Sequence, residues 1–173
     1  QVAIGFRTCS RHDDHRYALR LLNVILGENM SSRLFQKVRE DLGLAYSIHS
    51  STSFFDDTGE LVIAAGLDED KVGPALRLIR KEIESLIDRP PTAGELRRAR
   101  DYVIGQLELS QENTESQMMN LGENLLGFGR NVAPSEAKQA LREITPAQVR
   151  HTAGAFFRPE RVSLALISAM KKA

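Results

Sequence analysis

Over residues 44–67 apolar side chains recur at every second position, whereas the flanking segments have them three or four positions apart. This change of pattern constrains the fold more than any other feature. Apolar and polar side chains alternate in the first and last parts of this segment, on either side of the turn residues 54–59. Alternation on both sides of a turn predicts an antiparallel hairpin whose loop is longer than two residues. The alternating segments 2–7 and 162–168 predict two more strands, one near each end of the chain.

Helical periodicity, with apolar residues three or four positions apart, flanks the hairpin on both sides. Gly27 and Gly43 are predicted to end the two helices before the hairpin, and Pro90–Pro91 the long helix after it. Thr92–Glu95 and Thr145–Gln148 each match a capping box, in which two side chains reach each other's backbone N–H. The predicted helical segments are 18–25, 34–42, 71–87, 92–107, 115–126, 134–144 and a last segment from Thr145.

The order of the predicted elements is strand, two helices, hairpin, several helices and strand. A few strands far apart in sequence join most economically in one mostly antiparallel sheet with helices packed on one face, a two-layer α+β fold. We expect a single domain, 1–173, because neither side of the Pro90–Pro91 turn has enough strands to close a sheet alone. The chain begins at Gln1, already in a predicted strand, which indicates a piece of a longer protein or a processed chain.

Composition excludes several classes of function. Lys and Arg total 23 and so do Asp and Glu, so no global basic field would attract nucleic acid. No apolar run approaches roughly 20 residues, the length that spans a bilayer, so membrane insertion is not expected. A single cysteine, Cys9, excludes an intrachain disulfide and is expected to be a buried or inert thiol. From the first residues we expect no signal peptide, and the cellular location stays open.

Motifs for metal and nucleophile chemistry are absent from the sequence. No H-x-x-E-H, H-E-x-x-H, G-x-S-x-G, Walker loop or G-x-G-x-x-G occurs. The only histidine cluster is His-Asp-Asp-His at 12–15, which could hold a metal if it were helical. The favoured interpretation is a polar turn in which Asp13 or Asp14 caps the following helix. We therefore expect no metal ligands and no catalytic residues in this chain.

Arg39 and Tyr46 are the candidate binding residues. Arg39 lies near the end of a predicted helix and Tyr46 just inside the next strand, so the short turn at Gly43 would bring both to one end of the sheet. A planar guanidinium and a rigid phenol can together bind a carbonyl or a developing oxyanion. The alternative is structural: Arg39 pairs with Glu40 or Asp41, and Tyr46 fills the core. The residues alone leave both interpretations open.

The sequence around these two residues has a specific pattern. It reads L-G-E-N-M-S-S-R-L-F over 26–35, then V-R at 38–39 and G-L-A-Y-S at 43–47. This pattern resembles the second, non-catalytic half-domain of the insulinase (pitrilysin) family of zinc peptidases, in its bacterial and processing-peptidase-like branch. Weaker similarity covers nearly all of the remaining chain. Family members often have small residues where this chain has Glu28 and Asn29, so the shape of that loop is expected to differ.

The resemblance implies that the chain is the non-catalytic, substrate-binding half of a zinc metalloendopeptidase, whose two halves close around an unfolded peptide. Zinc would be held by an H-x-x-E-H motif and a distant Glu in the other half, located upstream in the same polypeptide or in a separate subunit. This chain would bind no cofactor and would be inactive alone. Arg39 and Tyr46 match, at the same spacing, the Arg and Tyr that hold the substrate carbonyl in the family.

Two functions therefore remain open from the sequence. In the first, the chain is a peptide-holding part of a hydrolase, whose partners are the catalytic half-domain and a peptide substrate. An edge strand of its sheet could add an extended peptide by backbone hydrogen bonds. In the second, the chain is a scaffold subunit of the same fold with no proteolytic role.

Overall fold

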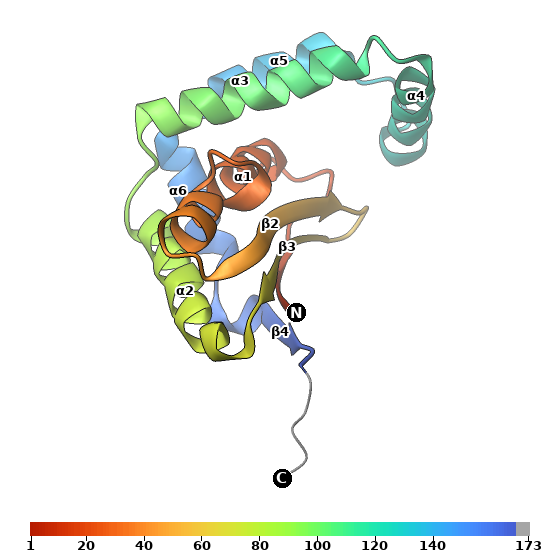
Figure 1. Cartoon of the computed structure of the whole chain (residues 1–173). Helices are drawn as coiled ribbons and strands as arrows, with labels where there is room; N and C mark the ends of the chain where they lie inside the picture. Colours follow the sequence, from red (N-terminus) through yellow and green to blue (C-terminus); the bar gives the residue numbers. More distant parts are fainter. Residues whose placement is uncertain (169–173) are drawn as a thin grey trace.

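The sheet forms the base of the molecule in the computed structural model, which describes residues 1–168 (Figure 1). Within these residues four strands pair antiparallel in the spatial order β2-β3-β1-β4, so β2 and β4 are the edges. The strands are β1 (Val2–Thr8), β2 (Ala45–Phe54), β3 (Gly59–Leu67) and β4 (Val162–Leu166). The predicted hairpin is β2–β3, and the strands predicted near the two chain ends are β1 and β4.

Helices connect these strands and gather over one face of the sheet (Figure 1). Alternate residues of β1 show which face is covered, because Val2, Ile4 and Phe6 are buried. Their neighbours Ala3 and Arg7 point to the other face and keep solvent exposure. The predicted two-layer α+β fold is thus confirmed. The helical elements are α1 (Arg16–Asn23), η1 (Val24–Glu28), η2 (Phe35–Asp41), η3 (Glu69–Lys71), α2 (Val72–Asp88), α3 (Ala93–Ser110), α4 (Thr114–Phe128), α5 (Pro134–Glu143), α6 (Pro146–Phe156) and η4 (Pro159–Arg161).

The core lies between the covered sheet face and the helices. Elements α1, η1 and η2 lie against β2, while α6 contacts α1, α2 and β1. The aliphatic side chains of these elements exclude water most completely, and their burial is the main stabilising term of such a layer. The largest fully buried apolar side chains are Leu19, Leu21, Leu22, Leu26, Leu34, Val38, Leu61, Ile63, Ile79, Leu86 and Leu141.

The helix before the hairpin differs from the prediction over most of its length. It has π-helical geometry over η2, and Leu42, four residues after the buried Val38, is exposed. A wider turn changes the angular spacing of side chains, so a residue four positions after Val38 no longer falls on the same face. Gly43 ends the element as predicted, with φ of +56° in the left-handed region that favours glycine.

The capping box of α3 also ties this helix to the segment that precedes η2. The Glu95 carboxylate accepts hydrogen bonds from the Thr92 backbone N–H at 2.8 Å and from Arg33 Nε and Nη2 at 2.7 and 3.1 Å. Burial by itself would raise the pKa of Glu95, but the hydrogen bonds from Arg33 and Thr92 outweigh it and lower the pKa to about 2. Arg33 is thereby fixed to the start of α3.

Stability is therefore expected to depend on the ionisation of Glu95. Because its folded-state pKa lies below the unfolded value of 4.5, its contribution is complete above pH 4.5 and is lost as pH falls towards about 2. Glu95→Gln keeps a capping acceptor but removes the charge that Arg33 needs, and should lower the free energy of unfolding at pH 7 by about 2 kcal/mol. Urea titrations at pH 7 and pH 3 measure this. An equal loss at both pH values would contradict it.

Candidate functional site

Arg39 lies on the surface of η2 with its guanidinium partly exposed. The guanidinium carbon is 4.8 Å from the centre of the Phe35 ring, and Nε is 3.8 Å from a Glu40 carboxylate oxygen. An exposed ion pair at that distance contributes little and is easily exchanged. Among residues 1–168 the guanidinium forms no hydrogen bond, and the side chain is 44% exposed. The pairing with Glu40 that the structural alternative predicted is present, but it does not bury the Arg39 side chain.

Tyr46 points outward because the strand is irregular at that point. The register of β2 against β3 shifts between Ala45 and Ser47, and this β-bulge breaks the predicted alternation that placed Tyr46 on the same face as Ile48. Ala45 and Ile48 are buried, whereas Tyr46 is 73% exposed. The alternative that Tyr46 fills the core is therefore wrong.

The hydroxyl of Tyr46 has a hydrogen-bond partner in Asp68, which lies between β3 and η3. It donates a hydrogen bond to Asp68 Oδ1 at 3.2 Å. A hydrogen bond from Lys71 lowers the pKa of Asp68, so this carboxylate is a charged acceptor for the phenol proton. A substrate carbonyl would have to compete with Asp68 for the single proton of the hydroxyl.

The turn between these two residues is fixed by backbone hydrogen bonds. Gly43 N–H donates to the Arg39 carbonyl at 3.1 Å, and Leu44 N–H donates to the Val38 carbonyl at 2.8 Å. Val38 is fully buried and anchors η2 to the hydrophobic core. The structure therefore places Arg39 and Tyr46 on either side of one closed turn, both with exposed side chains.

The loop before η2 is held by polar contacts that sequence reasoning missed. The Glu28 carboxylate accepts hydrogen bonds from both terminal guanidinium nitrogens of Arg20 and from Asn23 Nδ2, the last at 2.7 Å. These partners lie on α1, five and eight residues earlier. An acid in place of a small residue thus anchors the loop to α1. The sequence shows that residue 28 is acidic, but it does not show which side chains the carboxylate contacts.

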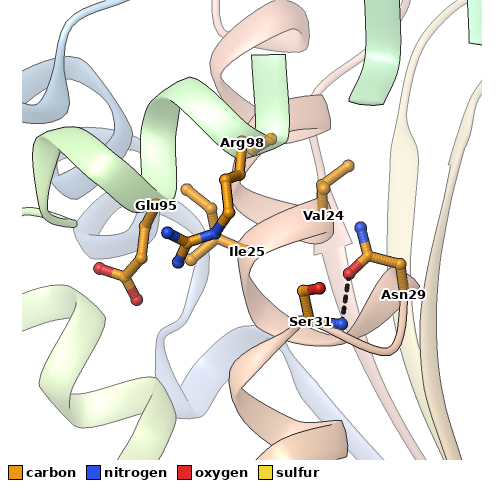
Figure 2. Close-up of a pocket in the computed structure, with 7 residues that line it drawn as sticks. Val24, Ile25, Asn29, Ser31, Glu95 and Arg98 are labelled. Atoms are coloured by element: carbon orange, nitrogen blue, oxygen red, sulfur yellow. Dashed lines mark hydrogen bonds between the residues drawn. The ribbon is translucent and has the colours of Figure 1, made fainter. Parts of the chain in front are cut away.

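A small cavity separates this loop from α3 (Figure 2). Its volume is about 30 Å³, and its polar lining comes from Asn29 and Ser31 on the loop and Glu95 and Arg98 on the helix. The Ser31 N–H donates to Asn29 Oδ1 at 2.9 Å, which closes the turn. A space of this size accommodates about one water molecule. It is too small for a peptide side chain, and the candidate site is the exposed surface around Arg39 and Tyr46.

The histidines do not form a zinc site. In the part of the chain that the structure describes, no group of three or more His, Cys, Asp or Glu side chains converges as metal ligands would. His15 Nδ1 is 2.8 Å from Asp13, while His12 lies edge-on against Phe128. Residues 12–15 therefore do not provide the tetrahedral set of ligands that zinc prefers. No helix within 1–168 has the length and apolar character needed to cross a bilayer.

Cys9 is expected to be unreactive in the folded chain. It is buried at the end of β1, and burial, together with the nearby charge of Asp13, raises its pKa to about 11. Because the thiolate is the reactive form, a disulfide reagent at pH 8 should label the native chain at least about 100-fold more slowly than the chain unfolded in guanidinium. Similar rates in both states would show that Cys9 is accessible.

Comparison with known proteins finds a family match and similar solved structures for this chain. A family model described as "Peptidase M16 inactive domain" matches residues 1–103. An uncharacterized zinc protease of Streptomyces coelicolor is 35% identical over 98% of this chain. A protease structure from Helicobacter pylori has a TM-score of 0.85 at 18% identity, and a peptidase M16 inactive domain from Pseudomonas fluorescens has 0.78 at 20%, each over 94% of this chain. The chain spans 37% of the Streptomyces relative and 39% and 40% of the two solved chains.

Proposed function

The chain belongs to the peptidase M16 family, as its inactive domain, and on this premise we propose that it is the substrate-binding half of a zinc metalloendopeptidase. The longer protein of which it would be a part is called the parent protein below. In this proposal residues 1–173 form one domain, and the catalytic half lies elsewhere in the same polypeptide or in a separate subunit. Zinc bound by that other half would supply the activated water for peptide hydrolysis.

One observation carries the proposal, namely the outward presentation of two hydrogen-bond donors by the Gly43 turn. Arg39 and Tyr46 both keep exposed side chains, although each has a local carboxylate partner in Glu40 or Asp68. A guanidinium offers up to five N–H donors in a plane, and a phenol offers one O–H on a rigid ring. Donors fixed in this way can bind a peptide carbonyl and stabilise negative charge as it develops on that oxygen.

The edge strand that carries Tyr46 adds a second means of holding a peptide. β2 lies at one edge of the sheet, and its backbone groups on the outer side are not paired with another described strand. An extended peptide can add to such an edge by main-chain hydrogen bonds. The side chains along β2 are mostly small and polar, so this mode would place few demands on the peptide sequence.

Peptide binding by the chain alone tests the proposal. The probe is a fluorescein-labelled peptide from reduced and carboxymethylated casein. We expect it to bind the chain, which increases its fluorescence anisotropy, and to remain uncleaved. Arg39→Ala should weaken binding by about tenfold, the loss of one charge-assisted hydrogen bond. Arg80→Ala, which changes an exposed arginine on α2, is the matched control and should bind as the unmodified chain does. Absence of binding, or equal binding by Arg39→Ala, would favour the scaffold function instead.

A further inference from the structure

Glu82 is a buried carboxylate at a position that an apolar residue would ordinarily occupy. It lies on the core face of α2, between Ile79 and Leu86, and is 2% exposed. Its Oε1 accepts a hydrogen bond from Lys37 Nζ at 2.5 Å. Within the described residues its other oxygen, Oε2, has no hydrogen-bond partner. Such a group costs free energy to bury, and a partner on one oxygen only does not remove that cost.

The partner of Glu82 belongs to the element that presents Arg39. Lys37 lies in η2 two residues before Arg39, and its side chain spans from the half-exposed surface to the buried carboxylate. One turn earlier, Arg33 contacts the same helix α2 through Ser85, at 3.4 Å, in addition to its ion pair with Glu95. Two cationic side chains thus join the segment 33–41 to the helices behind it.

Stability alone does not explain this ion pair, in which Glu82 is buried and Lys37 is half-exposed. Replacing a buried ion pair by apolar side chains of similar volume is often neutral or stabilising, so what the charges add is a defined position. A π-helical segment has a less regular hydrogen-bond ladder than an α-helix and is frequent at functional sites. A tether from Lys37 to α2 fixes the rotation of this segment, and with it the direction of the Arg39 side chain.

We propose that Glu82 is a positioning residue, which acts through Lys37 to orient the Arg39 guanidinium towards the substrate carbonyl. This inference rests on the proposed function and deepens it. Glu82 touches neither the peptide nor the reacting atoms. Its effect should appear in kcat rather than KM, because a misdirected guanidinium loses the contact that strengthens in the transition state.

A double-mutant cycle in the parent protein tests this role. Glu82→Gln should lower kcat for an internally quenched fluorogenic peptide by about fivefold, with KM changed by less than about twofold. In the Arg39→Ala background the same substitution should lower kcat by less than about twofold, because nothing remains to be oriented. Glu84→Gln, which removes an exposed partner of Arg80 on the same helix, is the matched control and should leave kcat unchanged.

A second variant covers the case in which Glu82→Gln does not fold. Glu82→Leu combined with Lys37→Met replaces the ion pair by apolar side chains, so the protein should keep its melting temperature and still lose about fivefold in kcat. Unchanged kcat in this variant, or an equal loss with and without Arg39, would overturn the positioning role. If Arg39→Ala itself leaves kcat unchanged, Glu82 has no Arg39 effect to support and this inference fails. The proposed function fails only if Tyr46→Phe is also silent and the chain binds no peptide. If Arg39→Ala lowers kcat but the Glu82 variants do not, only the positioning role of Glu82 is overturned.

Discussion

Replacing Arg39 by alanine, or Tyr46 by phenylalanine, in the parent protein is expected to lower kcat for peptide hydrolysis by more than about tenfold. Each substitution removes a donor that would face the carbonyl oxygen while negative charge develops on it. Tyr46→Phe is the sharper change, since it keeps the exposed ring and removes only the hydroxyl that now donates to Asp68. Steady-state hydrolysis of a quenched fluorogenic peptide measures the loss.

Zinc content and an exposed control variant separate this effect from damage elsewhere. Zinc measured by plasma mass spectrometry should be the same in wild type and in both variants, because neither residue would lie in the metal site. Arg97→Ala, another exposed arginine of this chain, should leave kcat unchanged. Wild-type rates for both Arg39→Ala and Tyr46→Phe would remove the site assignment, even if the chain binds peptides in another way.

Replacing Gly27 by valine is expected to lower the free energy of unfolding by about 3 kcal/mol, through overpacking. Gly27 lies in η1 where it packs on β2, and a Cβ there would lie 2.7 Å from Ser50 Oγ and 3.0 Å from Ser50 N. The second of these atoms is backbone and cannot turn away. The strand or the helical turn would therefore have to move apart, and the loop that leads to η2 would move with it.

The control for this prediction is the same substitution at a glycine with open space. A Cβ at Gly105, within α3, would meet no atom within 4 Å. Gly105→Val should change the free energy of unfolding by less than about 0.5 kcal/mol, because valine and glycine differ modestly in helix propensity. Guanidinium titrations of both variants provide the comparison. A loss of under 1 kcal/mol for Gly27→Val would mean that η1 and β2 adjust easily.

Local patterns in the sequence predicted much of the fold because their causes are local. The β2–β3 hairpin followed from the alternation of side chains, and both capping boxes, at Thr92 and Thr145, form as predicted. The match of the family model to residues 1–103 confirms the resemblance seen over 26–47. Each of these features depends on residues that are close together in sequence.

The features that were not predicted depend on residues far apart. The bulge that turns Tyr46 outward arises where β2 pairs with Gly66 and Leu67, and alternation within β2 alone gives no sign of it. The burial of Glu82 depends on Lys37, 45 residues earlier, and a glutamate on a helix is usually exposed. Periodicity in one segment cannot reveal a partner in another, so these contacts required the three-dimensional structure.

The roles of Arg39 and Tyr46 are a prediction that rests on side-chain chemistry and on the family pattern. Side-chain chemistry showed what the pair could bind, and the family pattern suggested what it does bind. The structure adds that both side chains are exposed beside one hydrogen-bonded turn, and a substrate-holding role requires their exposure.

Complementation tests most directly whether this chain holds a peptide that another half cleaves. The chain, the separately expressed remainder of the parent protein and an equimolar mixture would each be incubated with the quenched fluorogenic peptide. We expect no hydrolysis by the chain, little by the remainder and restored hydrolysis by the mixture, with zinc bound to the remainder alone. Cleavage by the chain on its own, or a full rate from the remainder without it, would contradict the proposed division of roles.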